Sequence, residues 1–366
     1  MRLKHNQSLN LEKERTYLHH INHFRGIAII FIVFWHCFSA GITHYNQNIT
    51  LFAFSLLKLL PGGTTFFVFI SGYLFHYIYY KKFDFKLFII KKVKFVLFPF
   101  ILISSTDILY YLSRYIISII FDSDKSQIFL AKLNNYSFIK TYLYGHGEIP
   151  IGLWYIPFIM VVFALSPLFI KFICIRAKVQ LTIICILLIS SMIIHRTADN
   201  SILGIFQNVI YFTPAYLLGI FMSINFNKIY VKLKVRNLYI LISAILITIF
   251  LSKIIEFYSP IFRIFDLMIF QKILLSIFFT VYLMKYKKKQ IKVLNLIAEN
   301  SFGIFFIHGI IIWLFNAFIF KLKITIESNS AFVYFGLSTF ILIISLSITI
   351  LIRKALPNKS KYIIGC

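Results

Sequence analysis

An arginine and a histidine interrupt the first long apolar stretch of the chain. In FRGIAIIFIVFWH, Arg25 and His36 lie eleven positions apart with mostly apolar residues between them. Eleven steps of about 100° end roughly 20° past three full helical turns, so both side chains point to one side of a helix, about 16 Å apart along its axis. Histidine can act as a general base near neutral pH. Ionisable groups on one face of a membrane helix are typical of a substrate path or a reaction site.

Each of the two residues also has a purely structural interpretation. Arg25 would fit a snorkelling anchor at the membrane surface, because its apolar stem can lie along the helix while its charge reaches water. His36 would fit a packing residue that hydrogen-bonds to a neighbouring helix. The elements around the two residues must decide between these interpretations.

The composition is that of a membrane protein. The chain has 366 residues, of which 60% are hydrophobic and 14% charged, and its mean hydropathy is +0.84. Soluble domains average about 25% charged residues. Long apolar runs recur along the whole chain, which excludes a soluble α/β or all-β protein and predicts an all-α, polytopic membrane bundle.

The apolar runs predict about ten transmembrane helices, since a bilayer needs about 20 apolar residues per helix. Asp107 and Arg114 interrupt the third of these runs. We expect a cytoplasmic N-terminal segment over 1–23, a membrane domain over 24–352 and a cytoplasmic tail over 353–366. A signal peptide cleaved near residues 39–41 is the alternative to an uncleaved first span. The predicted spans are 24–45, 62–80, 94–118, 149–171, 179–195, 203–223, 237–252, 265–284, 297–320 and 331–352.

The charges favour cytoplasmic N- and C-termini. In this topology 26 lysines and arginines are assigned to the N-terminal side and 10 to the opposite side, with residues near the end of a span, including Arg114, counted with the adjacent loop and with Arg25 and Lys272 counted on neither side. Positive charges collect on the cytoplasmic side of membrane proteins. The net charge of +26 is therefore explained by topology and by attraction to anionic membrane lipids, and no nucleic-acid partner is expected.

The cysteines predict neither a metal site nor a disulfide. Their spacing is not that of metal ligands, and most of them fall in apolar runs. We interpret them as small buried hydrophobic residues. The four are Cys37, Cys174, Cys185 and Cys366.

Five motifs in order resemble the acyltransferase 3 family of membrane proteins. The first is FRGIAIIFIVFWH itself, an arginine with a histidine eleven positions on. The order and spacing of the motifs are similar to the family's over residues 20–350. The other four are GGTTFFVFISGYLF (62–75), LWYIPFIMVVFALSPLF (153–169), PAYLLGIF (214–221) and SFGIFFIH (301–308).

The resemblance implies a helical membrane enzyme that acylates hydroxyl groups of glycans outside the cytoplasm, usually with acetyl-CoA as the donor. Two departures from the family pattern stand out. Lys91 and Lys94 take the places of a basic pair that is usually two arginines, and lysine lacks the planar fork that grips phosphate in a bidentate manner. The chain also ends too soon for the C-terminal SGNH domain of many members, so it resembles the stand-alone membrane form.

The resemblance and the helix geometry together predict the roles of the site residues. Lys91, Lys92 and Lys94, near Arg25, would hold the phosphates of the donor. His36 would take the proton from the acceptor hydroxyl while that oxygen attacks the acyl carbonyl, a contribution of about 10²–10⁴-fold. No bound cofactor and no metal are expected, acetyl-CoA being a substrate.

Five further residues are candidates for substrate binding, each with a structural alternative. Ser71 precedes a glycine and an aromatic residue, a pattern that also serves close helix packing. His308 would line the same cavity as His36 or pack in the core. His146 and Glu148 would meet the acceptor sugar or lie in a solvated loop. Trp154 would stack on a sugar or belong, with its neighbour Tyr155, to an interfacial aromatic belt.

We therefore predict an O-acetyltransferase of the bacterial inner membrane that acts on a surface polysaccharide or its lipid-linked precursor. Its partners would be an acyl-CoA donor, a glycan acceptor and membrane lipids. The alternatives are a carrier or flippase for a glycan or small anion, and a non-catalytic scaffold of an export complex. An enzyme changes the mass of its acceptor and needs a donor, whereas a carrier does neither.

Overall fold

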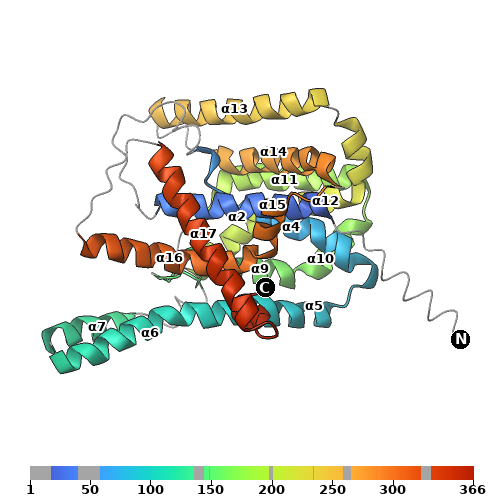
Figure 1. Ribbon diagram of the computed structural model, residues 1–366. Helices are drawn as coiled ribbons and strands as arrows, with labels where there is room; N and C mark the ends of the chain where they lie inside the picture. Colours follow the sequence, from blue (N-terminus) through green and yellow to red (C-terminus); the bar gives the residue numbers. More distant parts are fainter. Residues whose placement is uncertain are drawn as a thin grey trace, which may run out of the picture.

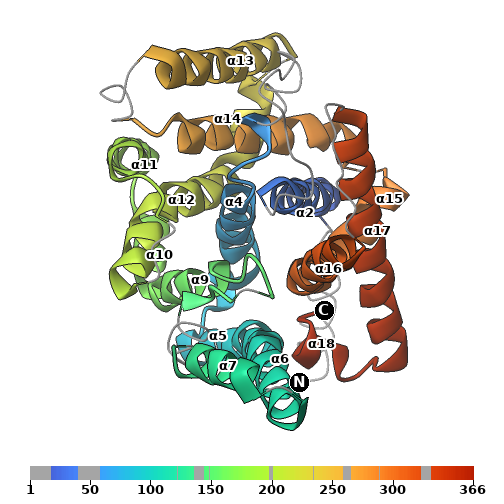
Figure 2. The same cartoon turned by 90° about the vertical axis from the view of Figure 1, so that its left-hand side faces the viewer.

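The described part of the chain is helical throughout. Within it the computed structural model contains no β-strand, which confirms the all-α prediction. Most helices run side by side in Figure 1, and Figure 2 views several of them end-on. The residues that the structure describes are 18–39, 58–121, 123–135, 144–147, 149–197, 201–233, 235–258, 265–287, 289–322 and 331–366.

Several helices have the length and apolarity of membrane spans. Among the described residues six qualify, and a seventh crossing results if the bent pair α9 (Tyr155–Ala164) and α10 (Ser166–Cys174), at 55° to each other, counts as one span. These helices indicate a multi-pass membrane protein. The six are α2 (His19–Ser39), α11 (Ala177–Ile194), α12 (Ile202–Lys232), α14 (Leu267–Tyr282), α16 (Ser301–Lys321) and α17 (Ala331–Ala355).

The other three predicted spans are helical but fall outside that set. α4 (Thr64–Leu74) has only 11 residues before the backbone continues as a π-helical turn, η1 (Phe75–Tyr79). α6 (Phe98–Phe121) follows a second π-helical turn, η3 (Val93–Leu97), and contains Asp107 and Arg114. α13 (Val235–Tyr258) has a shorter apolar part, Leu238–Leu251. Each of the ten predicted spans thus overlaps a described helix, but length and apolarity identify only six or seven crossings in the described chain, so the predicted number of ten is not confirmed.

Polar residues at helix starts explain where several elements begin. Ser201 caps α12 by accepting a hydrogen bond from the Gly204 backbone N–H at 3.0 Å. Asp266 caps α14 through the Met268 N–H at 2.8 Å. Asp84 caps α5 (Phe85–Lys92) through the Leu87 N–H at 2.9 Å. Each side-chain oxygen satisfies a backbone donor that the helix itself leaves unpaired.

Small residues let α4 and α12 pack backbone against backbone. A side chain at Gly72 would overlap the Tyr216 carbonyl, and one at Gly219 would overlap the Phe69 carbonyl. Close approach through glycines is a common packing mode between membrane helices. The Ser-Gly pair of the second predicted span therefore serves packing through Gly72, and Ser71 lies beside this contact.

The predicted external loop 119–148 contains a helix that the sequence analysis did not predict. α7 (Ser123–Asn135) packs against α6, and the two project together from the rest of the molecule (Figure 1). α7 contains no long apolar run, because lysine, serine and asparagine residues separate its few apolar residues, and the sequence analysis looked for long apolar runs.

Both ends of the described chain join the helical body. α2 begins at His19, so residues 19–23 of the predicted N-terminal segment belong to the first helix. At the other end, α18 (Ser360–Ile363) packs against η3 and α6. Its Tyr362 ring lies 5.4 Å from that of Phe95. The predicted tail over 353–366 is therefore folded.

The cysteine prediction is wrong for two residues. All four cysteines are free, and Cys37 is buried, but Cys174 and Cys185 are exposed on α10 and α11. Apolar side chains on the outer face of a membrane bundle face lipid, so an apolar run does not imply burial within the protein.

Candidate active site

Two histidines from distant helices form the centre of the candidate site. The Nδ1 of His36 on α2 lies 2.7 Å from the Nε2 of His308 on α16, and the two rings are nearly parallel, at 5°. The Nδ1 of His308 lies 3.0 Å from the Ile304 carbonyl oxygen. His308 is fully buried, whereas His36 keeps some exposed surface.

These contacts determine which nitrogen of His36 carries the proton. A carbonyl can only accept, so His308 Nδ1 carries a proton and donates it to Ile304. In a neutral imidazole the other nitrogen is then an acceptor. His308 Nε2 therefore accepts a hydrogen bond from His36 Nδ1–H, which makes Nε2 the unprotonated nitrogen of a neutral His36. Such a nitrogen can take a proton from a hydroxyl group.

A short segment of backbone, residues 149–153, covers the histidine pair; we call it the covering segment. Gly152, with φ of +90°, lies directly against the His36 ring, and Gly309 lets the backbone of Ile151 approach α16. The start of the segment is fixed by Asp107, which accepts a hydrogen bond from the Ile149 N–H at 2.8 Å. Side chains at either glycine would clash with these neighbours, so the cover depends on both.

Arg25 ties α2 to the start of α16. Its Nε lies 2.9 Å from the Ser301 hydroxyl and 3.1 Å from the Ala298 carbonyl oxygen, and its Nη2 lies 2.5 Å from the same carbonyl. Ala298 belongs to α15 (Lys292–Glu299), which crosses α2 at Gly26. Arg25 and His36 thus both face α16, as their spacing predicts.

A small apolar cavity lies between Arg25 and the histidine pair. Ile32 stands between Arg25 and His36 on α2, and Phe302 and Phe305 stand between Ser301 and His308 on α16. The cavity has a volume of about 10 Å³, which is room for about one water molecule. Its other lining residues are Phe67 and Tyr155.

The three predicted phosphate-binding lysines face different surroundings. Lys91 is exposed. The Lys92 ammonium lies 4.4 Å from the centre of the Phe163 ring and 5.2 Å from that of Phe88. Burial lowers the pKa of Lys92 to about 8, because taking the ammonium out of water disfavours its charged form.

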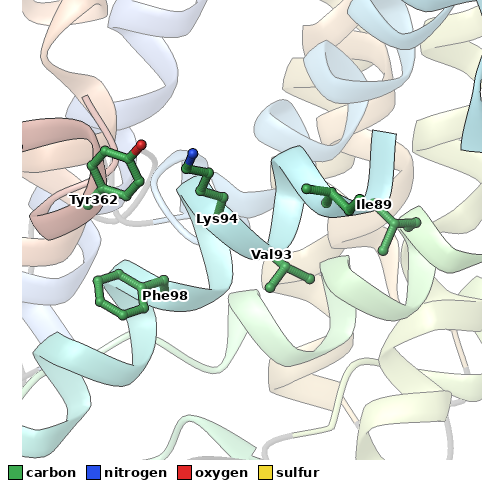
Figure 3. A pocket seen from close by; sticks show the side chains of 6 residues that line it. Ile89, Val93, Lys94, Phe98 and Tyr362 are labelled. Carbon is green, nitrogen blue, oxygen red and sulfur yellow. The ribbon is translucent and has the colours of Figure 1, made fainter. Parts of the chain in front are cut away.

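Lys94 lines a groove on the surface of the bundle. Its ammonium lies 5.0 Å from the centre of the Tyr362 ring. Figure 3 shows this groove, which has a volume of about 470 Å³ and an almost wholly apolar lining. The remaining lining residues are Ile89, Ile90, Val93 and Phe98.

The other predicted substrate-binding residues lie in varied positions. Ser71 lies near Tyr155, which borders the small cavity. His146 is half-buried, and Glu148 lies outside the described residues. Trp154 follows the covering segment, and its ring stacks on Phe158 at 5.6 Å between centres.

The sequence analysis missed a polar cluster beyond the histidines. The Arg196 guanidinium lies 4.7 Å above the Trp154 ring, and Tyr211 donates a hydrogen bond to Asp266 at 2.8 Å. The spacing of these residues gives no sign that they meet. Lys272, by contrast, was visible as a lysine inside an apolar span; it is fully buried and donates to the Leu59 carbonyl and to the Gln271 side chain, both at 2.6 Å.

Two histidines without further ligands do not make a metal site. In the ranges that the structure describes, no group of three or more histidine, cysteine or carboxylate side chains is placed to hold a metal ion. As a histidine, His36 can take up and return a proton near neutral pH.

Comparisons with known proteins give one match. A family model described as an acyltransferase domain matches residues 18–352, nearly the whole chain. Neither a curated protein nor a solved structure matches the chain significantly. The matched range includes the histidine pair, Arg25 and the covering segment.

Proposed function

We propose that the protein transfers an acetyl group from acetyl-CoA to a hydroxyl group of a surface polysaccharide or its lipid-linked precursor. The chain belongs to this acyltransferase family and is a membrane O-acyltransferase. The observation that carries the proposal is the His36–His308 hydrogen bond of 2.7 Å. It makes Nε2 the basic nitrogen of a partly exposed histidine. The covering segment of Gly152 lies directly over that histidine.

His36 acts as the general base in the proposed reaction. Its Nε2 takes the proton of the acceptor hydroxyl while the oxygen forms a bond to the thioester carbonyl carbon. When the tetrahedral intermediate collapses, the carbon–sulfur bond breaks and the coenzyme A sulfur receives the proton from His36. The products are the acetyl ester and the free thiol, and His36 returns to its neutral form.

His308 keeps His36 in the productive tautomer. Because Ile304 holds the proton of His308 on Nδ1, His308 can only accept from His36. A positively charged His36, formed during the reaction, keeps its Nδ1–H pointed at the same acceptor. The cover of residues 149–153 supports transfer over hydrolysis, because water kept from the site cannot attack the thioester.

The donor approaches from the cytoplasmic side in this proposal. In the proposed topology of ten spans in the bacterial inner membrane, the bias of 26 basic residues over 10 favours a cytoplasmic position for the start of α2, and hence for Arg25. Lys91, Lys92 and Lys94 then lie on the same side and would attract the donor phosphates as point charges.

The proposal is tested by the mass of the acceptor. Surface glycan from cells with the gene, without it and with a His36→Ala copy is compared by mass spectrometry, with protein levels measured in the same membranes. We expect an added mass of one acetyl group per modified residue only with the intact gene. A glycan that is moved across the membrane without any change of mass would instead support the carrier interpretation.

A further inference from the structure

Arg196 is held in a fixed orientation near the histidine pair. It follows the end of α11, is half-buried, and lies with its Cζ atom 4.7 Å from the centre of the Trp154 ring. A guanidinium plane above an indole is attracted by the ring electrons. A cation–π contact of this kind does not use the guanidinium N–H groups as donors to a hydrogen-bond acceptor.

The described residues do not use those N–H groups. Asp266 is the nearest carboxylate whose charge acts on Arg196, but its two oxygens accept from Tyr211 and from the Met268 N–H, both at 2.8 Å. Asp266 also donates its own backbone N–H to the Met192 carbonyl at 2.7 Å, which fixes it between α11 and α14. Within the described ranges no carboxylate forms an ion pair with Arg196.

Arg196 is also a neighbour of the reacting nitrogen. Its charge is close enough to act on His36. Trp154, on which it rests, comes directly after Gly152 and Leu153, and Gly152 lies against the His36 ring. A group bound at the edge of Arg196 therefore lies close to the place where an acceptor hydroxyl must meet His36.

We propose that Arg196, held above Trp154, binds an anionic group of the acceptor, so that the preferred acceptor is a sugar bearing a carboxylate or a phosphate as well as the hydroxyl that is acylated. This proposal rests on the proposed function and adds the charge of the substrate to it. The planar fork of arginine matches a carboxylate or phosphate in a bidentate manner. The donor phosphates would bind at the other end of the site, near Arg25, which lies about 16 Å along α2 from His36.

The first test compares matched acceptors. Purified protein in nanodiscs receives acetyl-CoA with methyl glucoside or methyl glucuronide, and with methyl galactoside or methyl galacturonide, and release of the coenzyme A thiol is followed. Wild type should prefer the acidic member of a pair by roughly tenfold or more in kcat/KM, the usual effect of one hydrogen bond to a charged group. Arg196→Gln should abolish the preference by raising KM for the acidic sugar, and Arg196→Lys should retain part of it.

Arg114 provides a matched control. It also lies over an aromatic ring, at 5.3 Å from the centre of Phe129, but in the α6–α7 pair. Arg114→Gln should leave the preference unchanged. Equal use of neutral and acidic sugars by wild type would overturn the proposal. So would an Arg196→Gln variant that loses activity equally with both sugars, because that result assigns Arg196 to the transition state or to folding.

The second test measures binding without any transfer. The chain has three tryptophans, so Trp35→Phe with Trp313→Phe leaves Trp154 as the only indole. Methyl glucuronide or inorganic phosphate should change its fluorescence in a saturable manner, methyl glucoside should not, and Arg196→Gln should remove the response. Saturable binding of the anion without acetyl transfer would contradict the proposed function and leave the subsite intact. Transfer without any anion response would contradict the subsite alone.

Discussion

His36 and His308 come from opposite ends of the chain and share a hydrogen bond of 2.7 Å between Nδ1 and Nε2. The same His308 donates to the Ile304 carbonyl one helical turn earlier. This order of donors and acceptors makes Nε2, the nitrogen that does not contact His308, the basic nitrogen of His36. The arrangement resembles an oriented general base, in which a second group fixes the tautomer of the first.

Replacement of His308 should reveal this orienting role. His308→Phe keeps a planar ring but removes the acceptor for His36 Nδ1–H, so we expect thioester-dependent acylation to fall by about 10²–10⁴-fold. His308→Gln offers a carbonyl oxygen in place of Nε2 and should retain more activity than His308→Phe. Thiol release by purified variants of equal folded content measures both. Activity of His308→Phe near that of wild type would show that His36 needs no orienting partner.

The covering segment should control water access. Gly152→Ala pushes a methyl group against His36, and Gly309→Ala pushes one against the Ile151 backbone. Both should displace the cover and raise thioester hydrolysis without acceptor relative to transfer with acceptor, because water reaches the site. Gly336→Ala on α17 is the control, since nothing lies within 4 Å of the added carbon. A transfer-to-hydrolysis ratio unchanged in both site variants would argue against a role for the cover.

Lys92 should make donor binding depend on pH. Its pKa is lowered to about 8, so the ammonium is charged below this pH and loses its proton as the pH rises through it. If its charge attracts the donor, the apparent KM for acetyl-CoA should rise between pH 7 and 9. An ordinary lysine would produce such a rise only near pH 10.4.

The matched variants separate this effect from other titrations. Lys92→Arg stays charged and should show a flat KM over this range, while Lys92→Met should have a high KM at every pH. A KM that rises equally in wild type and Lys92→Arg would exclude Lys92 as its cause. The same shift implies that stability rises from about pH 8 to the ordinary lysine value of 10.5, because the unfolded chain binds more protons there.

The charge bias predicts the orientation of the chain. Lys91 and Lys288 should face the cytoplasm and Asn134 of α7 the outside. Single cysteines at these positions are probed in intact cells with an impermeant thiol reagent, in a background without native cysteines because Cys174 and Cys185 are exposed. Only position 134 should react. Labelling of position 288 from outside would reverse the topology and move the donor side to the other end of α2.

The sequence alone predicts the features that depend on the geometry of a single helix. Helix periodicity predicts that Arg25 and His36 face one side, because eleven residues nearly complete three turns. The apolar runs locate the ten helical regions. The partner of His36 could not be predicted in this way, since His308 lies 272 positions away and only the packing of α2 on α16 brings the two together.

Residues that meet through tertiary packing account for the other differences. The three lysines share one stretch of sequence but separate in the structure, because Lys92 lies near Phe163 of α9 and Lys94 near Tyr362 of α18. Arg196 follows α11 and Asp266 caps the start of α14, so the charge of Asp266 acts on Arg196 only because α11, α12 and α14 pack together. For Trp154, the stacking platform that we predicted for a sugar is occupied in part by Phe158 and Arg196.

The most direct test of the central claim is the activity of His36→Gln. Glutamine keeps a hydrogen-bonding group on α2 but cannot take up and return a proton at neutral pH. We predict normal accumulation in the membrane together with a loss of acetyl transfer of about two to four orders of magnitude, the usual contribution of a positioned base. The measurement is acetylation of the glycan by mass spectrometry, normalised to the protein level in the same membranes. A His36→Gln protein that accumulates normally and transfers acetyl groups at a rate near that of wild type would contradict the assignment of His36 as the base.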